Sequence, residues 1–560
     1  MSQPSKKQNF LQGAALLALS NAIVKVIGAV YKIPMSEIIG DVGFSFFNTA
    51  YEIYTLLLTI ATAGLPIAMS RMISQAHSLG QYQRVRKIYR VAKTLYLSLG
   101  LVCSLVMMLG CQWLASRMGQ PDAWIAILCL APCAFLMGFL SAYRGFFQGQ
   151  GNMAPTSASQ VLEAVCKLVV GLSAALALKY FTQSVSLAAG GAIFGVTASC
   201  LASAVFLSFR FRKNYRQLPE TDEEVERFVS TAGQLMKIAV PITLGSAGLQ
   251  LLNVLEISIY MRRLEGLLSS GLYNEALVNQ LESAIQALPE YTPDKHYYLM
   301  ASDLKGAYNF SYTIFNLPAS FIIPINTSVL PAITACLTLG DDKGVRSTEE
   351  SAARITGLLA APCAVGLAVL GGPVMGLLRS AYAGEKLQLA GQLMTVMGCA
   401  VFFYSSLMYT NVLLQSHGKA HIPVIHTLLC GVVKLAALYV LTGNPNVGIL
   451  GVPLSALFCY VGILVLNLLA IRFRIPQKPR ILANLLRPML PALVMGVGVF
   501  GCLYVLRSLL HITSDLILCA APILVGVVLY CVCIFVFKTI TREDCLMLPK
   551  GEKIAKLLKL

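Results

Sequence analysis

The feature that most constrains this 560-residue chain is a series of long apolar runs. A helix needs about 20 predominantly apolar residues to span the hydrocarbon core of a bilayer, and these runs are long enough. Hydrophobic residues make up 56% of the chain and charged residues only 12%. We therefore predict an all-α polytopic membrane protein with about 14 transmembrane helices. The predicted spans lie near residues 10–33, 43–70, 88–115, 122–143, 156–178, 186–209, 238–261, 306–337, 355–378, 388–415, 421–441, 446–471, 488–506 and 516–537.

The formal net charge of +17 indicates how these spans are oriented. In a soluble protein it would suggest a nucleic-acid partner, but in a membrane protein Lys and Arg collect in cytoplasmic loops. Most of the 43 Lys and Arg lie on one side of the spans, including the basic segments 84–93, 210–216 and 472–480. With the even number of spans, this bias predicts a multi-pass protein of the cell membrane with both termini cytoplasmic and no nucleic-acid partner.

Two parts of the chain resemble each other, which predicts an internal repeat. Gln148 recurs as Gln415, 267 residues later. Lys167 recurs as Lys434 with the same shift. Each half holds six spans, so both halves enter the membrane from the same side, and we expect a parallel repeat with its main site between the halves.

This repeat sets the expected domain organisation. The predicted parts are an N-terminal six-helix lobe at 1–215, a cytoplasmic linker at 216–237, a C-terminal six-helix lobe at 238–475 with an outer loop at 263–305, helices 13 and 14 at 476–540, and a basic cytoplasmic tail at 541–560. We expect the linker, which carries an acidic block, to form a solvated helix and the outer loop to be partly helical. The basic tail is expected to lie on anionic lipid.

Ionisable side chains inside the spans give the most direct indication of function. Well inside the spans, away from their ends, there are three of each sign, namely Lys25, Lys167, Lys434, Glu52, Glu163 and Glu256. A charge at bilayer depth costs on the order of 3 kcal/mol or more, so such groups normally face a bundle interior or a wet cavity and mark a transport path. The pattern predicts a transporter.

Lys25 and Glu52 lie at similar predicted depth in the first two spans. One interpretation is a structural ion pair that joins the two helices. In the other, Lys25 binds a substrate phosphate as a point charge, and Glu52 competes with that phosphate for the lysine.

The other four intramembrane charges are predicted to form two structural pairs. Glu163 and Lys167 are four residues apart with the acid first, which favours an intrahelical pair. The repeat places Cys430 where a second glutamate would accompany Lys434, so Lys434 needs another partner. Glu256 lies at a suitable depth, and we predict that it pairs with Lys434.

Two motifs carry a family resemblance, AGLPIAMSRMISQ at 63–75 and RGFFQGQGNMAPTSASQVLEAVCK at 144–167. Through them the chain resembles the polysaccharide-exporter branch of the MATE-like (MOP) flippase superfamily, and within it the stage V sporulation protein B and Gram-positive MurJ-type lipid II flippase families. The resemblance covers essentially the whole chain. It implies alternating-access transport of an undecaprenyl-diphosphate-linked sugar from the inner to the outer leaflet, with helices 13 and 14 shaping a groove for the lipid tail.

The resemblance also implies roles for individual residues. Lys25 lies where MurJ-type proteins place a cationic cavity residue in their first helix, and Tyr31 with Lys32 falls near a second such position. Glu52 departs from that pattern, because it stands in a helix where better-known members supply cations. Identical headgroup coordination is therefore not expected.

Two arginines, Arg71 and Arg144, lie at the predicted cytoplasmic ends of spans 2 and 4. They can reach lipid phosphate there, or they can meet an incoming diphosphate headgroup. His417 and His421 have a spacing compatible with metal binding but no accompanying carboxylate motif, and the chain contains no P-loop. We expect no metal and no cofactor; a monovalent cation, a proton or the membrane potential are the energy sources left open.

Two functions follow from these observations. The first is a flippase for an undecaprenyl-diphosphate-linked saccharide, with lipid II as the leading candidate, in cell-wall or spore peptidoglycan synthesis. The alternative is a cation-coupled MATE-type exporter of small amphipathic compounds, in which acids such as Glu52 carry the ion. No catalytic carboxylate cluster or large extramembrane domain is apparent, so an enzyme is not expected. The expected partners are the lipid-linked sugar, anionic membrane lipids and cell-wall synthesis proteins.

Overall fold

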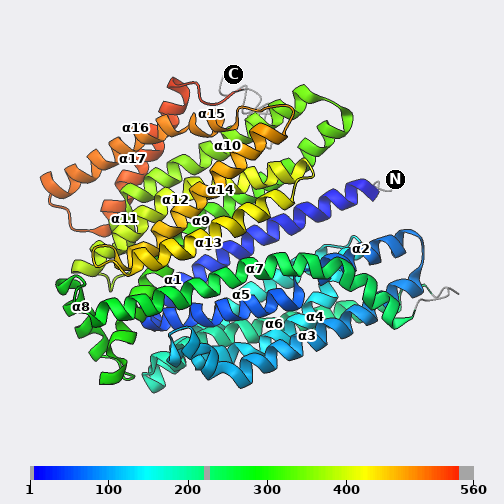
Figure 1. Ribbon diagram of the computed structural model, residues 1–560, viewed down its shortest axis with the longest axis horizontal. Helices are drawn as coiled ribbons and strands as arrows, with labels where there is room; N and C mark the ends of the chain where they lie inside the picture. Colours follow the sequence, from blue (N-terminus) through cyan, green and yellow to red (C-terminus); the bar gives the residue numbers. More distant parts are fainter. Residues whose placement is uncertain (1–5, 220–226, 542–560) are drawn as a thin grey trace. The chain divides into compact units, whose positions relative to one another are not determined.

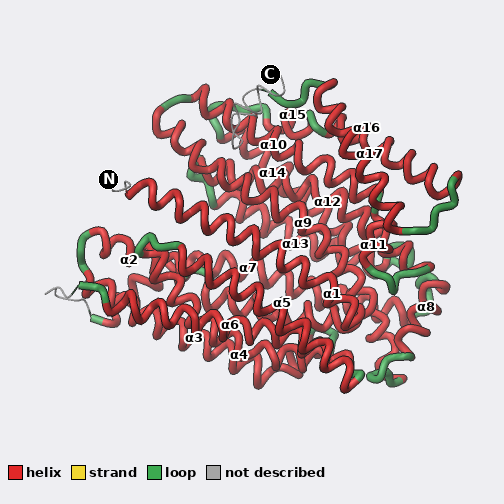
Figure 2. The backbone as a smooth tube through the Cα atoms, turned by 180° about the vertical axis from the view of Figure 1, so that it is seen from behind, coloured by secondary structure: helices red, strands yellow, loops and turns green. Residues whose placement is uncertain are grey.

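In the computed structural model, which describes residues 6–219 and 227–541, every regular element of those residues is helical and none is a strand (Figures 1 and 2). Twelve helical segments among these residues are long and apolar enough to cross a membrane. The predicted all-α polytopic class is confirmed, whereas the count of 14 spans is not. The acidic linker block at 220–226 and the basic tail from residue 542 lie outside the described residues.

The first helix accounts for part of the difference in span number. Helix α1 (Lys6–Thr62) contains the whole first predicted span and residues 43–62 of the second, which continues into α2 (Leu65–Ser78). Gly40 interrupts it with φ near +69°, a backbone conformation that glycine adopts without steric cost. The two spans are therefore separated by a kink and not by a loop. Helix α9 (His296–Leu339), which contains the predicted span 306–337, is not one of the twelve segments.

The chain divides into two units according to its internal packing. Unit 1 comprises Met1–Ser269 and Leu281–Asn309, and unit 2 comprises Ser270–Gln280 and Phe310–Leu560. The elements of unit 1 are α1, α2 (Leu65–Ser78), α3 (Tyr82–Arg117), η1 (Pro121–Ala123), α4 (Trp124–Gly149), α5 (Ala154–Thr182), α6 (Val185–Arg216), α7 (Phe228–Ser269), η2 (Pro293–Lys295), the end of α8 (Glu275–Gln286) and the start of α9.

Within unit 1, helices α3, α4, α5 and α6 lie side by side, with α5 and α6 forming the most extensive pair (Figure 1). Helix α7 packs against α1, α2 and α3. Its Thr243 hydroxyl accepts a hydrogen bond of 3.1 Å from the backbone N–H of Gly64, between α1 and α2. Helix α7 thus packs within unit 1, whereas the predicted boundary assigned residues from 238 onward to the second lobe.

The segment between α8 and α9 is also fixed to unit 1. Lys295 in η2 contacts both carboxylate oxygens of Asp122, at 2.8 and 2.9 Å. Glu290 accepts hydrogen bonds from the Ser184 hydroxyl at 2.7 Å and the Ser186 backbone N–H at 3.1 Å, at the start of α6. These contacts attach the segment before α9 to unit 1, and α9 itself carries a residue of the candidate site.

Unit 2 contains a second helical bundle. Its elements are the start of α8, the end of α9, α10 (Asp342–Val369), α11 (Gly371–Leu378), α12 (Gly384–Ser416), α13 (His421–Thr442), η3 (Gly448–Leu450), α14 (Gly451–Arg474), α15 (Ile481–Leu486), α16 (Met489–Tyr504), the π-helical turn η4 (Val505–Leu509) and α17 (Asp515–Val536). Helices α10, α12 and α14 pack in succession, and α13 packs on α14. Helices α16 and α17 pair with each other, and α16 also packs on α10.

Candidate functional site

A fully buried lysine, Lys305, lies in the interior of unit 1. It is the tenth residue of α9, about 14 Å along the helix from its first residue at 1.5 Å per residue. Its ammonium group donates hydrogen bonds to the Thr49 hydroxyl and, at 3.1 Å, to Oε1 of Gln120. A buried ammonium without such partners would be strongly unfavourable, so these oxygens are what make the interior position tolerable.

Gln120, which is also fully buried, joins α1 to α9 from the turn after α3. Its amide nitrogen donates to the hydroxyls of Ser45 and, at 3.1 Å, Ser302. Its amide oxygen accepts from Thr49 and Lys305. Both ends of the amide are used with the correct polarity, so the network fixes the orientation of this side chain.

Glu52 on α1 supplies a carboxylate beside this network. It accepts a hydrogen bond of 2.9 Å from the side chain of Gln250 on α7. Lys32, Lys305 and Glu256 all act on it electrostatically, the two lysines favouring its charged form and Glu256 opposing it. We refer to Lys32, Glu52, Glu256 and Lys305 as the charge cluster; it draws on α1, α7 and α9 and contains two groups of each sign.

The charge cluster differs from the pair predicted for the first two spans. Lys25 is exposed on α1 and forms no ion pair with Glu52 among the described residues. The cation on α1 that acts on Glu52 is Lys32, seven residues further along the helix. The second cation comes from α9.

Tyr31 and Lys167 take part in helix packing. The Tyr31 side chain is fully buried, and its hydroxyl donates a hydrogen bond of 2.7 Å to the backbone oxygen of Ala192 on α6. The Lys167 ammonium lies 5.3 Å from the centroid of the Tyr31 ring, a cation–π contact. Tyr31 therefore ties α1 to α5 and α6, and its hydroxyl is already engaged.

Glu163 has a closer partner than the lysine predicted for it. Its carboxylate lies 2.8 Å from Nη2 of Arg144, which also donates a hydrogen bond of 3.1 Å from Nε to the Ser159 hydroxyl. Lys167 interacts with Glu163 electrostatically. The principal contact thus joins α4 to α5, whereas the predicted contact lies within α5.

The remaining predicted site residues lie apart from these contacts. Arg71 is exposed on α2, and Lys434 is partly exposed on α13 of unit 2. Glu256 is buried in unit 1. Because Glu256 and Lys434 belong to different units, their pairing stays a prediction.

Sequence reasoning missed three members of the site, Lys305, Gln120 and Gln250. Lys305 was assigned to the last position of the outer loop at 263–305, but α9 begins at His296. The apolar run 297–301 just before Lys305 is a signal that could have placed it inside a helix. The two glutamines carry no charge. Gln250 lies inside the predicted span 238–261, a signal that could have marked it, whereas Gln120 lies in the short segment between two spans, where a surface amide is common.

His417, which was considered for metal binding, and the nearby His426 have other partners in unit 2. Nε2 of His417 lies 2.6 Å from the buried carboxylate of Glu349, and Nδ1 of His426 lies 2.8 Å from the side-chain oxygen of Asn467. No group of three or more His, Cys, Asp or Glu side chains suited to a metal ion occurs in the described part of the chain.

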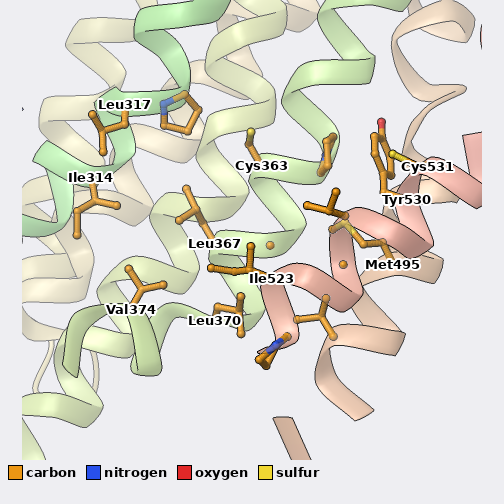
Figure 3. Close-up of a pocket in the computed structure, with 17 residues that line it drawn as sticks. Ile314, Leu317, Cys363, Leu367, Leu370, Val374, Met495, Ile523, Tyr530 and Cys531 are labelled. Atoms are coloured by element: carbon orange, nitrogen blue, oxygen red, sulfur yellow. The ribbon is translucent and has the colours of Figure 1, made fainter. Parts of the chain in front are cut away.

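Unit 2 also holds an apolar groove of about 510 Å³ (Figure 3). It is lined by side chains of α9, α10, α11, α16 and α17, among them Ile314, Leu367, Val374, Met495, Ile523 and Tyr530. The Tyr530 hydroxyl donates a hydrogen bond of 2.8 Å to the backbone oxygen of Leu358, so it is not available to a ligand as a donor. Helices α16 and α17 are the predicted helices 13 and 14.

Two family models match the sequence. One, described as polysaccharide biosynthesis protein, matches residues 10–336. The other, described as lipid II flippase MurJ, matches residues 301–520. Together the two matches extend over most of the chain.

Three proteins of Bacillus subtilis (strain 168) are each 25% identical to this chain. Stage V sporulation protein B aligns over 83% of both chains, and lipid II flippase MurJ over 76% of both. The uncharacterized membrane protein YabM aligns over 99% of this chain and 97% of its own.

Solved structures show the same fold. A lipid II flippase MurJ in an inward closed conformation gives a TM-score of 0.64 at 13% identity, covering 93% of this chain and 98% of that one. An inward-facing multidrug resistance MATE transporter of the MOP superfamily gives 0.58 at 14% identity, covering 83% and 98%. At these identities the likeness concerns the fold alone.

Proposed function

Because the chain belongs to the polysaccharide biosynthesis protein family, we propose that it flips an undecaprenyl-diphosphate-linked saccharide from the inner to the outer leaflet of the cell membrane. It is a membrane transporter and not an enzyme. Lipid II is the leading substrate, since it is the lipid named for the MurJ family model and for a relative. The route is alternating access, and the product would serve cell-wall or spore peptidoglycan synthesis.

The observation that carries this proposal is the apolar groove of unit 2. Its lining is built from carbon and sulfur apart from Tyr530, whose hydroxyl is already bound to Leu358. A polyprenyl tail needs only apolar contacts, each buried CH₂ contributing about 0.8 kcal/mol. A small amphipathic compound would need a polar partner, which this groove does not offer.

The charge cluster of unit 1 supports recognition of the diphosphate. Lys32 and Lys305 both interact electrostatically with Glu52, and Glu256 acts on Glu52 as a like charge. Lysine binds phosphate as a point charge, so a diphosphate would compete with Glu52 for the two ammonium groups. Binding of the substrate would thereby change the charge balance of α1, α7 and α9 and favour one conformation over the other.

Two of the predicted site residues, Lys25 and Arg71, would act when the substrate enters the protein. Lys25 on α1 and Arg71 on α2 are accessible, and each can attract an anionic headgroup before it reaches the charge cluster. Arg144 is held by Glu163, so its contribution to substrate binding requires that pair to open.

A cation-coupled exporter is the second candidate, because one observation favours it. Glu52 and Glu256 interact as like charges within unit 1. A bound monovalent cation or a proton would relieve that repulsion. In the flippase the same two carboxylates would couple transport to the ion or to the membrane potential.

Reconstitution tests the proposal. Purified protein in liposomes should expose a fluorescent undecaprenyl-diphosphate disaccharide to a membrane-impermeant quencher faster than protein-free liposomes do. In cells that lack redundant flippases, depletion should make the lipid-linked sugar accumulate in the inner leaflet. Transport of small amphipathic cations without movement of the lipid in either assay would overturn the proposal in favour of the exporter.

A further inference from the structure

A second concave site lies in unit 2, separate from the apolar groove of the same unit. This pocket of about 390 Å³ is enclosed by the segment before and at the start of α8, the start of α12 and the turn between α13 and η3. Its lining is mainly polar, with the side chains Asn274, Glu385, Gln388, Gln392 and Asn446 among the residues around it. The predicted topology places this end of unit 2 outside the cell.

The walls of the pocket are held together by hydrogen bonds. Gln280 on α8 donates to the backbone oxygen of Ala383 at 2.8 Å and accepts from the backbone N–H of Lys386 at 3.2 Å. Both contacts fix α8 to the first turn of α12. The pocket is therefore preformed on this side, which lowers the entropy cost of binding a ligand.

The opposite side depends on Tyr273 and Gly448. The Tyr273 ring is buried and its hydroxyl accepts a hydrogen bond from the backbone of Ile449. A Cβ atom at Gly448 would lie 2.3 Å from the Tyr273 ring, and Gly448 has φ near +51°. Any side chain at Gly448 would displace the ring, so glycine is required for this wall.

The polar side chains of α12 are arranged for a ligand. Glu385, Gln388 and Gln392 recur at a spacing of three and four residues, which places them on one face of the helix. Both glutamines are exposed, and none of these three side chains hydrogen-bonds another described residue. They present two amide donor and acceptor pairs and one carboxylate acceptor toward the pocket.

The other side adds complementary groups. The Asn274 oxygen accepts from the backbone N–H of Leu277 at 3.2 Å, which leaves its NH₂ group directed away from that bond as a donor. Asn446 is exposed on the turn across from α12. The pocket thus offers amides on two sides, one carboxylate and no cationic lining residue.

From this arrangement we propose that the pocket is a binding site for a neutral, hydroxyl-rich saccharide on the outer face of the protein. Sugar hydroxyls both donate and accept, so they match amides and a carboxylate better than an anionic ligand would. The absence of Lys, Arg or His from the lining residues disfavours phosphate or a carboxylate ligand. This site requires the predicted outer orientation but does not rest on lipid flipping.

The experiment uses the full-length protein in nanodiscs and two soluble neutral disaccharides, cellobiose and N,N′-diacetylchitobiose, measured by saturation-transfer NMR. At least one disaccharide should show saturable binding. Gln388→Leu and, separately, Gln392→Leu should raise the dissociation constant at least about tenfold, because each removes hydrogen bonds that the ligand makes. Asn446→Leu, which lies on a turn and not in a helix, provides an independent variant if a helical substitution reduces folding.

The matched control is Gln415→Leu, at an exposed glutamine near the other end of α12. It should leave sugar binding unchanged. The proposal would be overturned if neither disaccharide bound. It would also be overturned if the pocket variants and the control bound the sugar equally, or if a charged peptide bound in preference to the sugars. None of these outcomes bears on flipping, since neither probe carries a lipid or a diphosphate.

Discussion

The buried polar site of unit 1 and the apolar groove of unit 2 differ in the kind of chemical group that each can bind. In unit 1, Lys305 is accepted into the interior because Thr49 and Gln120 supply oxygens and Glu52 supplies opposite charge. In unit 2, the groove beside α16 and α17 offers almost no hydrogen bonds. The first arrangement discriminates by charge and the second by apolar surface, so the two should respond to different changes in the substrate.

The largest effect is expected from Lys305→Met, which keeps most of the length of the unbranched side chain and removes its charge. Transport of a diphosphate-linked lipid should fall at least about 100-fold, equivalent to about 2.7 kcal/mol of lost stabilisation. The variant should also lose about 1–3 kcal/mol of stability, because Thr49 and Gln120 lose a buried donor. Liposome assays normalised to folded protein separate the two effects.

Lys295→Met is the matched control for Lys305→Met. It removes a lysine ten residues earlier, in η2, whose partner Asp122 lies outside the charge cluster. Transport by this variant should stay within about twofold of wild type, since a partly exposed ion pair contributes only about 0–1 kcal/mol. Normal transport by Lys305→Met would show that Lys305 does not take part in substrate binding.

The contribution of the groove to transport should depend on the length of the lipid tail and not on the charge of the headgroup. Ile523→Trp fills the groove from α17, whereas Leu524→Trp adds the same bulk at the adjacent position, which does not line it. Ile523→Trp should slow transport of an undecaprenyl substrate about tenfold, or about 1.4 kcal/mol, and spare a short-chain analogue with the same headgroup. Equal inhibition of both chain lengths would contradict tail binding in this groove.

Much of the fold could be predicted from the sequence because apolar run length determines membrane spans directly. The all-α class and most helix positions agree with the structure, and the resemblance drawn from residues 63–75 and 144–167 is confirmed by the family match. The kink at Gly40 was not predicted, since a glycine in a long apolar run can lie within a helix, a bend or a loop. The placement of α7 depends on tertiary packing, which leaves no local pattern.

The candidate site was less predictable, for reasons that differ by residue. Glu52 and Glu256 were found because a carboxylate inside an apolar run is conspicuous. Lys305 was missed because it lies near the edge of such a run, where a lysine is common. The partner of Glu163 was assigned within its own helix, whereas Arg144 reaches it from α4, and only the packing of two helices brings these groups together.

A double-mutant cycle on Arg144→Gln and Glu163→Gln would measure the interaction energy between these two side chains. The pair lies 2.8 Å apart with 15% and 28% of the side chains exposed, so a coupling energy of about 1 kcal/mol is expected. The corresponding cycle on Lys167→Gln and Glu163→Gln should give a smaller value, because that interaction is not a direct contact. Thermal or chemical unfolding measures both, and a larger coupling for Lys167 would restore the originally predicted pair.

The smallest expected effect is a loss of stability at alkaline pH that originates at Tyr273 in unit 2. Burial raises the pKa of Tyr273 from 10.0 to about 12, although the hydrogen bond from Ile449 opposes the shift. The unfolded chain therefore releases this proton first, and the stability that the buried phenol contributes below pH 10 is lost as the pH rises to 12. Tyr273→Phe should cost about 1 kcal/mol at pH 8, where Ile449 loses its acceptor, and the difference from wild type should shrink above pH 10. Melting curves of wild type and Tyr273→Phe between pH 8 and 12 measure this convergence. Parallel curves for the two proteins would mean that burial does not keep the phenol of Tyr273 protonated.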